Sequence, residues 1–82
     1  MIDYSALHSL TARALIAALQ RDGFVFARQR GSHHRYNHHN RRRVTVPFTR
    51  TGDTFAPKTL RTIIEDQARW TEDDLRRLGL IK

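Results

Sequence analysis

The sequence of 82 residues predicts an α+β fold, with a three-stranded antiparallel sheet, two helices on one of its faces and a short third helix at the end. Three observations indicate this fold. Apolar residues recur at helical spacing in one segment before the middle of the chain and in another after it. Three short segments between them carry the aromatic and β-branched residues of strands. The connections between these segments are too short for crossovers, so the strands pair as antiparallel neighbours. The expected order is α-β-β-β-α, followed by the short helix.

The first helix is predicted over Ala12–Asp22. Thr11 is a suitable N-cap, because its hydroxyl oxygen can accept a hydrogen bond from a backbone N–H of the first turn. Leu15 and Leu19 fall on one side of this helix and supply its apolar stripe. Gly23 stands where a glycine commonly ends a helix in the left-handed conformation.

Three strands are predicted over Phe24–Arg30, His33–His38 and Arg43–Phe48. Gly31-Ser32 separates the first two as a turn or a bulge. The third strand has the clearest alternation of apolar and polar residues. Pro47 has no N–H to donate to a neighbouring strand, so that end of the third strand is expected at an edge of the sheet or just past its pairing.

Alternation along the strands assigns the side chains to two faces of the sheet. The face under the helices is expected to hold Phe24, Phe26, Tyr36, Val44, Val46 and Phe48. The uncovered face is expected to hold Gln29, His33, Arg35, Arg43 and Thr45. A bulge at Gly31-Ser32 would alter this assignment, because an extra residue reverses the alternation beyond it.

The second main helix is predicted over Pro57–Ala68, with proline in its first turn. Thr71 and Asp74 resemble a capping box that opens a short helix over Glu72–Leu78. Trp70 is expected to anchor this tail on the apolar core rather than to stack on a base. The three helices thus complete the predicted order.

Length and composition predict one domain over residues 1–82, with a core over about residues 12–68 and a C-terminal extension over residues 69–82. The chain has no cysteine, which excludes disulfides and thiolate metal ligands. No apolar stretch approaches the roughly 20 residues that span a bilayer, and no signal peptide is recognisable. A cytoplasmic protein without a membrane partner is expected.

The charge is concentrated in the middle third of the chain. Residues 24–50 hold seven arginines and no acidic residue, together with four of the five histidines. The segments before and after each carry equal numbers of basic and acidic side chains, so the whole net charge of +7 lies in this middle segment. Such a segment favours nucleic acid as a partner over an anionic membrane or an acidic protein.

Three motifs occur in order: Gly31-Ser32-His33-x-x-Tyr36, then Arg42-Arg43-Val44-Thr45-Val46-Pro47, then Pro57-Lys58-x-Leu60-Arg61-x-Ile63-Ile64. Together they resemble the HicA toxin family, small ribonucleases of bacterial toxin–antitoxin modules that have a double-stranded-RNA-binding-like fold. The resemblance covers about residues 12–68. The N-terminal ten residues and the tail after Ala68 have no counterpart in the shorter members.

The resemblance implies an endoribonuclease that cleaves mRNA without a cofactor and is inhibited by a HicB-like antitoxin. It also implies that His33, the histidine after Gly-Ser, is the catalytic residue. Without the motif, the simpler interpretation of His33 is an exposed strand histidine that has no role. The resemblance therefore carries the step from RNA binding to catalysis.

The residue types suit RNA cleavage without a metal, because the RNA's own 2′-hydroxyl can be the nucleophile. Histidine suits the proton transfers, since its ordinary pKa of about 6.5 lies near neutral pH. Arginine suits the charge on the phosphate oxygens. His33 and Arg35 are two residues apart on one strand face, about 7 Å, so both can reach one phosphate. Whether His33 acts as acid or base stays open.

The basic residues near His33 are candidates for binding RNA. By default such arginines, including Arg41 and Arg42, form a solvated surface, but the charge of the segment favours contacts to phosphates. The candidate RNA-binding residues are Arg28, Arg30, Ser32, Arg35, Arg43 and Lys58, and Gly31 is expected to shape the turn. A non-catalytic RNA-binding module that uses the same basic face is the alternative function.

The other histidines are not expected to bind a metal. His34 and His38 have the parity of the inner face and lie about 13 Å apart along one strand, too far to share an ion. No Asp, Glu or Cys lies within residues 24–50 to complete a ligand set. We expect packing or edge roles for both residues, and His39 falls in a turn.

Overall fold

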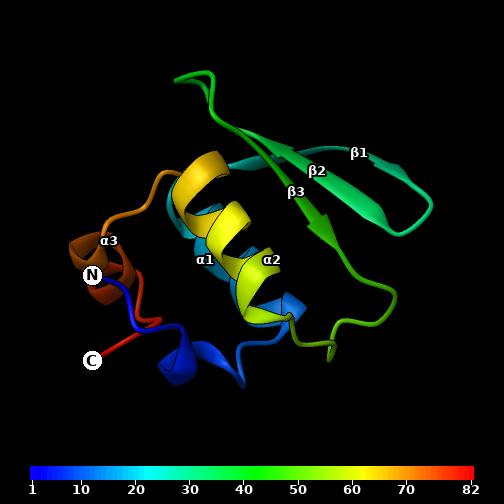
Figure 1. The fold of residues 1–82 in the computed structure, drawn as a ribbon. Helices are drawn as coiled ribbons and strands as arrows, with labels where there is room; N and C mark the ends of the chain where they lie inside the picture. The colour runs from blue at the N-terminus through cyan, green and yellow to red at the C-terminus, as the bar shows by residue number, and fades with distance from the viewer.

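The computed structural model describes residues 1–82 and has the predicted order of elements (Figure 1). A 3₁₀ turn η1 (Tyr4–Leu7) precedes α1 (Ala12–Arg21), β1 (Val25–Arg30), β2 (His33–Asn37), β3 (Arg43–Pro47), α2 (Pro57–Arg61), the π-helical segment η2 (Thr62–Gln67) and α3 (Glu72–Arg77). The strands form one antiparallel sheet in the order β1-β2-β3. The α+β prediction is confirmed, and the predicted bounds agree with the observed ones within one residue, except that the single helix predicted over Pro57–Ala68 is divided into α2 and η2. None of the helices is long and apolar enough to cross a membrane.

The predicted caps hold the two ends of α1. The Thr11 hydroxyl accepts a hydrogen bond from the backbone N–H of Ala14. Gly23 has a φ of +101°, and a Cβ at this position would lie 2.9 Å from Nε2 of His38. Glycine is therefore required here both by the left-handed backbone and by the packed imidazole.

Both main helices lie on the same side of the sheet (Figure 1). The core is one cluster of 17 buried residues to which the helices, β2, β3 and both ends of the chain contribute. Phe24, Tyr36, Val44 and Val46 are buried in it, as predicted for the inner face. Phe48 packs against the cluster but is only partly buried.

Phe26 lies on the predicted face of the sheet, but it is not buried under the helices as expected, because the residue is 50% exposed. It contacts Tyr36 edge-on across the strands, with ring centroids 5.7 Å apart, so it does share the inner face. The helices cover β2 and β3 but leave every residue of β1 exposed. An aromatic residue on this outer strand therefore remains in contact with solvent.

A bulge in β1 changes which of its residues face His33. The pairing register shifts between Phe26 and Arg28, so Arg28 lies opposite Arg35 and Gln29 lies opposite His34. Residues directly opposite each other share a face of the sheet. The predicted position of Gln29 beside His33 is therefore wrong, because the bulge precedes it and does not fall at Gly31-Ser32. The same shift places Arg28 on the face of Arg35.

Gly31-Ser32 forms a two-residue turn between Arg30 and His33, which face each other across the hairpin. Gly31 has a φ of +58°, and Ser32 has no positive φ. Glycine at the first position with an ordinary second residue is the combination of a type II′ hairpin turn. The turn sets the register that places Arg30 directly opposite His33.

The free edge of β3 is closed by a side chain. The backbone N–H of Thr45 points away from β2 and donates to Oε1 of Gln67, with N and O 2.7 Å apart. Gln67 belongs to η2, so this bond fixes the second helical segment beside the edge strand.

Candidate functional site

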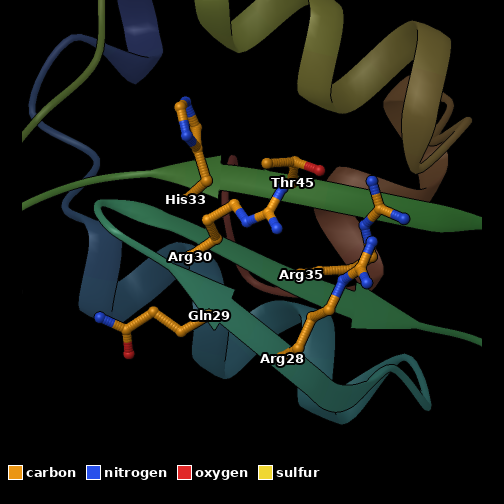
Figure 2. A pocket seen from close by; sticks show the side chains of 6 residues that line it. All are labelled: Arg28, Gln29, Arg30, His33, Arg35 and Thr45. Carbon is orange, nitrogen blue, oxygen red and sulfur yellow. The ribbon is translucent and has the colours of Figure 1, made fainter.

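A hollow of about 510 Å³ opens on the sheet face that carries His33 (Figure 2). It is lined by Arg28, Gln29, Arg30, His33, Arg35 and Thr45. No carboxylate and no large apolar side chain is among these residues. The hollow is therefore a polar and positively charged surface.

The strand register explains how these residues meet. Arg30 lies opposite His33, and Arg28 lies opposite Arg35 on the neighbouring strand. Thr45 of β3 lies on the other side of Arg35. Figure 2 shows these side chains on one side of the sheet, whereas Gln29 at the border points away from them. The Gln29 amide instead donates to the carbonyl oxygen of Gly31.

The charged side chains of the hollow have no partner within the protein. No hydrogen bond or ion pair satisfies the guanidiniums of Arg28, Arg30 and Arg35, and the His33 imidazole is also free. Elsewhere in the chain, by contrast, Arg42 and Arg77 both pair with Asp22. Three unpaired guanidiniums that line the same hollow as one imidazole can hold an anion, and a guanidinium fork fits phosphate oxygens.

The structure does not bring all the predicted residues into this hollow. Arg43 is exposed at the opposite end of β3, opposite Asn37, and does not line it. Ser32 lies in the exposed turn, where its carbonyl oxygen accepts from the Phe48 backbone N–H. Lys58 lines a separate hollow next to α2.

Arg42, interpreted from sequence as part of the basic surface, has a structural role instead. Its side chain is 16% exposed and pairs with Asp22 at 3.0 Å. It also donates to the carbonyl oxygen of Ala68 and lies over the ring of Phe24. The Arg42 guanidinium is thus part of the core packing and is not free for a ligand.

The other side chains of the histidine-rich segment are also engaged. His34 stacks on Phe48 with ring centroids 3.8 Å apart, and His38 Nε2 is 2.7 Å from the carbonyl oxygen of Asp22. The packing roles predicted for both are confirmed. Tyr36 of the Gly-Ser-His motif is buried, which raises the pKa of its hydroxyl. No three His, Asp or Glu side chains gather in a metal-binding arrangement.

Sequence reasoning missed a second hollow of about 340 Å³, which adjoins the first at His33 and Thr45. Thr59, Thr62 and Gln67 contribute polar side chains to it. The sequence does contain a pattern that groups two of these residues, because Thr59 and Thr62 are three positions apart and so lie on one side of the helix. Their proximity to His33 depends on how the helix docks on β3, which local sequence does not show.

Fold and hollow together define a class of small basic α+β proteins with an anion-attracting surface on the open side of a three-stranded sheet. The family model described as the HicA toxin of bacterial toxin–antitoxin modules matches residues 12–69. The chain therefore belongs to the HicA toxin family, and the resemblance seen in its motifs is confirmed. Membership implies an antitoxin as partner. A search of curated proteins finds no match.

Proposed function

We propose that the protein is a metal-independent endoribonuclease that cleaves mRNA and acts as the toxin of its module. One observation carries the proposal. His33, the histidine of the family motif, is unpaired and shares with three unpaired arginines a hollow without a carboxylate. This arrangement offers a proton-transfer group and charge stabilisation, and it lacks the clustered carboxylates that two-metal nucleases use.

In the proposed reaction the 2′-hydroxyl of the RNA attacks the adjacent phosphorus. The P–O bond to the 5′-oxygen of the next nucleotide breaks, which leaves a 2′,3′-cyclic phosphate and a 5′-hydroxyl. His33 exchanges a proton with one of the two oxygens that change their bonding. Arg30 and Arg35 flank His33 and stabilise the negative charge on the phosphate oxygens, because their guanidiniums have no competing acid.

The inhibitor in this proposal is a HicB-like antitoxin that presents acidic side chains to the hollow. Its carboxylates would neutralise Arg28, Arg30 and Arg35 and cover His33 in one contact. The absence of internal acidic partners for these arginines supports this mode of inhibition.

The chemistry is tested with a short RNA that the purified protein cleaves and with the same RNA carrying one 2′-deoxynucleotide at the cleavage site. We expect cleavage in EDTA, products with 2′,3′-cyclic phosphate and 5′-hydroxyl ends, and an uncut deoxy substrate. Cleavage that requires added Mg²⁺, or that proceeds at the deoxy position, would contradict the mechanism. RNA binding without any cleavage would instead support the non-catalytic module.

A further inference from the structure

The second hollow lies between the edge of the sheet and the helix that begins at Pro57. The sheet contributes His33, Thr45 and Pro47 to its walls, and α2 and η2 contribute Lys58, Thr59, Thr62 and Gln67. Its volume of about 340 Å³ is within the range of small-molecule sites. It adjoins the arginine hollow, and the two share His33 and Thr45 as lining residues.

The position of His33 determines what can enter. His33 lines both hollows, with guanidiniums on one side and the helix on the other. In Figure 2 its imidazole rises from the sheet in the direction of the yellow-green helix α2. A phosphate bound at His33 therefore has one neighbouring nucleotide on the arginine side and the other beside the helix. The helix side carries one cation, Lys58, and no arginine. Its other side chains are uncharged, so beyond the reach of Lys58 it suits an uncharged group such as a base.

The walls of the second hollow have the two properties that a base needs. The Pro47 ring provides apolar surface, the threonine methyl groups add to it, and the buried Ile63 side chain lies at the base of the hollow. Thr59 makes no side-chain hydrogen bond, while the Thr62 hydroxyl donates to the Lys58 carbonyl and keeps its acceptor capacity.

Gln67 supplies an oriented donor. Its Oε1 accepts the hydrogen bond from the Thr45 backbone N–H, which leaves the amide NH₂ without a partner. An amide held in this way presents its two N–H groups in a fixed direction. A base that carries a carbonyl oxygen or an unprotonated ring nitrogen is the complementary ligand.

We propose that the second hollow is a nucleobase subsite that binds one unpaired base next to the phosphate at His33. Thr59, Thr62 and Gln67 then determine which base is accepted, and the substrate is single-stranded RNA, whose bases are free to turn out of the stack. The inference rests on the proposed ribonuclease function and adds base recognition to it.

The cleavage test uses a pool of short RNAs with random sequence, read out by sequencing the product ends. We expect wild-type cleavage to favour one base over the poorest one by about tenfold at the position beside the cut. The Thr59→Val/Thr62→Val variant should reduce this preference to less than about threefold, because the isosteric change removes the hydroxyls. Thr54→Val, in an exposed loop outside both hollows, should retain the wild-type preference. A preference unchanged in the double variant, or absent from the wild type, would overturn the subsite.

A binding test separates failure of the subsite from failure of the catalytic proposal. The four nucleoside 3′-monophosphates and ribose 5-phosphate are titrated into the His33→Ala protein and followed by NMR. At least one nucleotide should shift the Thr59, Thr62 and Gln67 resonances more than ribose 5-phosphate does. Equal shifts from ribose 5-phosphate would show that only phosphate binds, and the subsite would be wrong even if the protein cleaves RNA. If the shifts depend on the base but the wild-type protein cleaves no RNA, the subsite is supported and the proposed ribonuclease activity is refuted.

Discussion

Arg28, Arg30 and Arg35 differ from the arginines around the core in lacking any acidic or carbonyl partner. Arg42 is held by Asp22 and a backbone carbonyl, and it contributes to packing. The guanidiniums near His33 line an open hollow and have no partner within the protein. Contacts to phosphate that release counterions are the natural use of such side chains, and these contacts depend on salt rather than on sequence.

Arg30→Gln should therefore weaken RNA binding and make it less sensitive to salt. Loss of one phosphate contact to a single strand reduces the slope of log K against log salt by about 0.7. Fluorescence anisotropy with a labelled RNA at several salt concentrations measures both effects. Arg50→Gln, an equal loss of charge at an exposed loop residue outside both hollows, is the control. Equal slopes for wild type and Arg30→Gln would show that Arg30 makes no phosphate contact.

At the scale of elements, the bulge in β1 decides the composition of the site. Uninterrupted alternation from Phe24 predicts Gln29 beside His33, but the shift after Phe26 reverses the faces. Arg28 consequently lines the hollow together with Arg30. A bulge depends on pairing with the next strand, so the residues of β1 alone do not predict it.

Features set by neighbouring residues were predictable, and features set by distant ones were not. Thr11 and Thr71 cap their helices as expected, because capping needs only the following turn. The bond from the Thr45 N–H to Gln67 joins residues 22 positions apart and closes a sheet edge. The sequence indicated a strand edge and a helix. It did not indicate that a helix side chain would bond to the free N–H of that edge, or that a hollow would form between the two.

The turn at Gly31 gives a prediction for the hairpin that carries His33. Gly31→Ala should lower the free energy of unfolding by about 1–2 kcal/mol, because its φ of +58° is unfavourable for any L side chain although the added Cβ would touch nothing. Gly52→Ala is the matched control, since that glycine has no positive φ and equally open surroundings. Urea denaturation of both variants measures the difference. A Gly31→Ala protein as stable as Gly52→Ala would refute the strained turn.

At the scale of the whole molecule, Asp22 joins the part that matches the family model to the tail beyond it. Its carboxylate accepts hydrogen bonds from Arg42, Trp70 and Arg77, although its side chain is only 10% exposed. Leu75 of α3 is buried in the same core. The tail is therefore packed into the fold and tied to it through one carboxylate.

Acid should weaken the attachment of the C-terminal tail to the rest of the fold through Asp22. Burial alone would raise the pKa of Asp22, but the hydrogen bonds from Trp70 and Arg77 and the charge of Arg42 outweigh burial and lower it. A carboxyl whose pKa is lower in the folded state stabilises the protein at pH values above its pKa in the unfolded state, which is about 3.9. That stability is lost as the pH falls through the folded pKa.

Asp22→Asn should lower the free energy of unfolding by about 3 kcal/mol at pH 7, because it leaves the Arg42 guanidinium without its charged partner. The difference from wild type should begin to narrow below about pH 5 and be smaller at pH 3, because the unfolded carboxyl, with a pKa of about 3.9, then binds a proton that the folded carboxylate does not. Urea denaturation across this range measures it. Asp73→Asn, at a side chain that is 95% exposed, should change little. A full difference that persists at pH 3 would contradict the role assigned to the Asp22 charge.

The role of His33 is tested most directly by the single-turnover rate of RNA cleavage in EDTA for His33→Ala. His39→Ala, which removes an exposed histidine from the β2–β3 turn, serves as the control. We expect His33→Ala to lose at least about a hundredfold in rate while its RNA affinity and thermal unfolding stay close to wild type. His39→Ala should cleave normally. A folded His33→Ala protein that cleaves as fast as His39→Ala would contradict the assignment of catalysis to this imidazole.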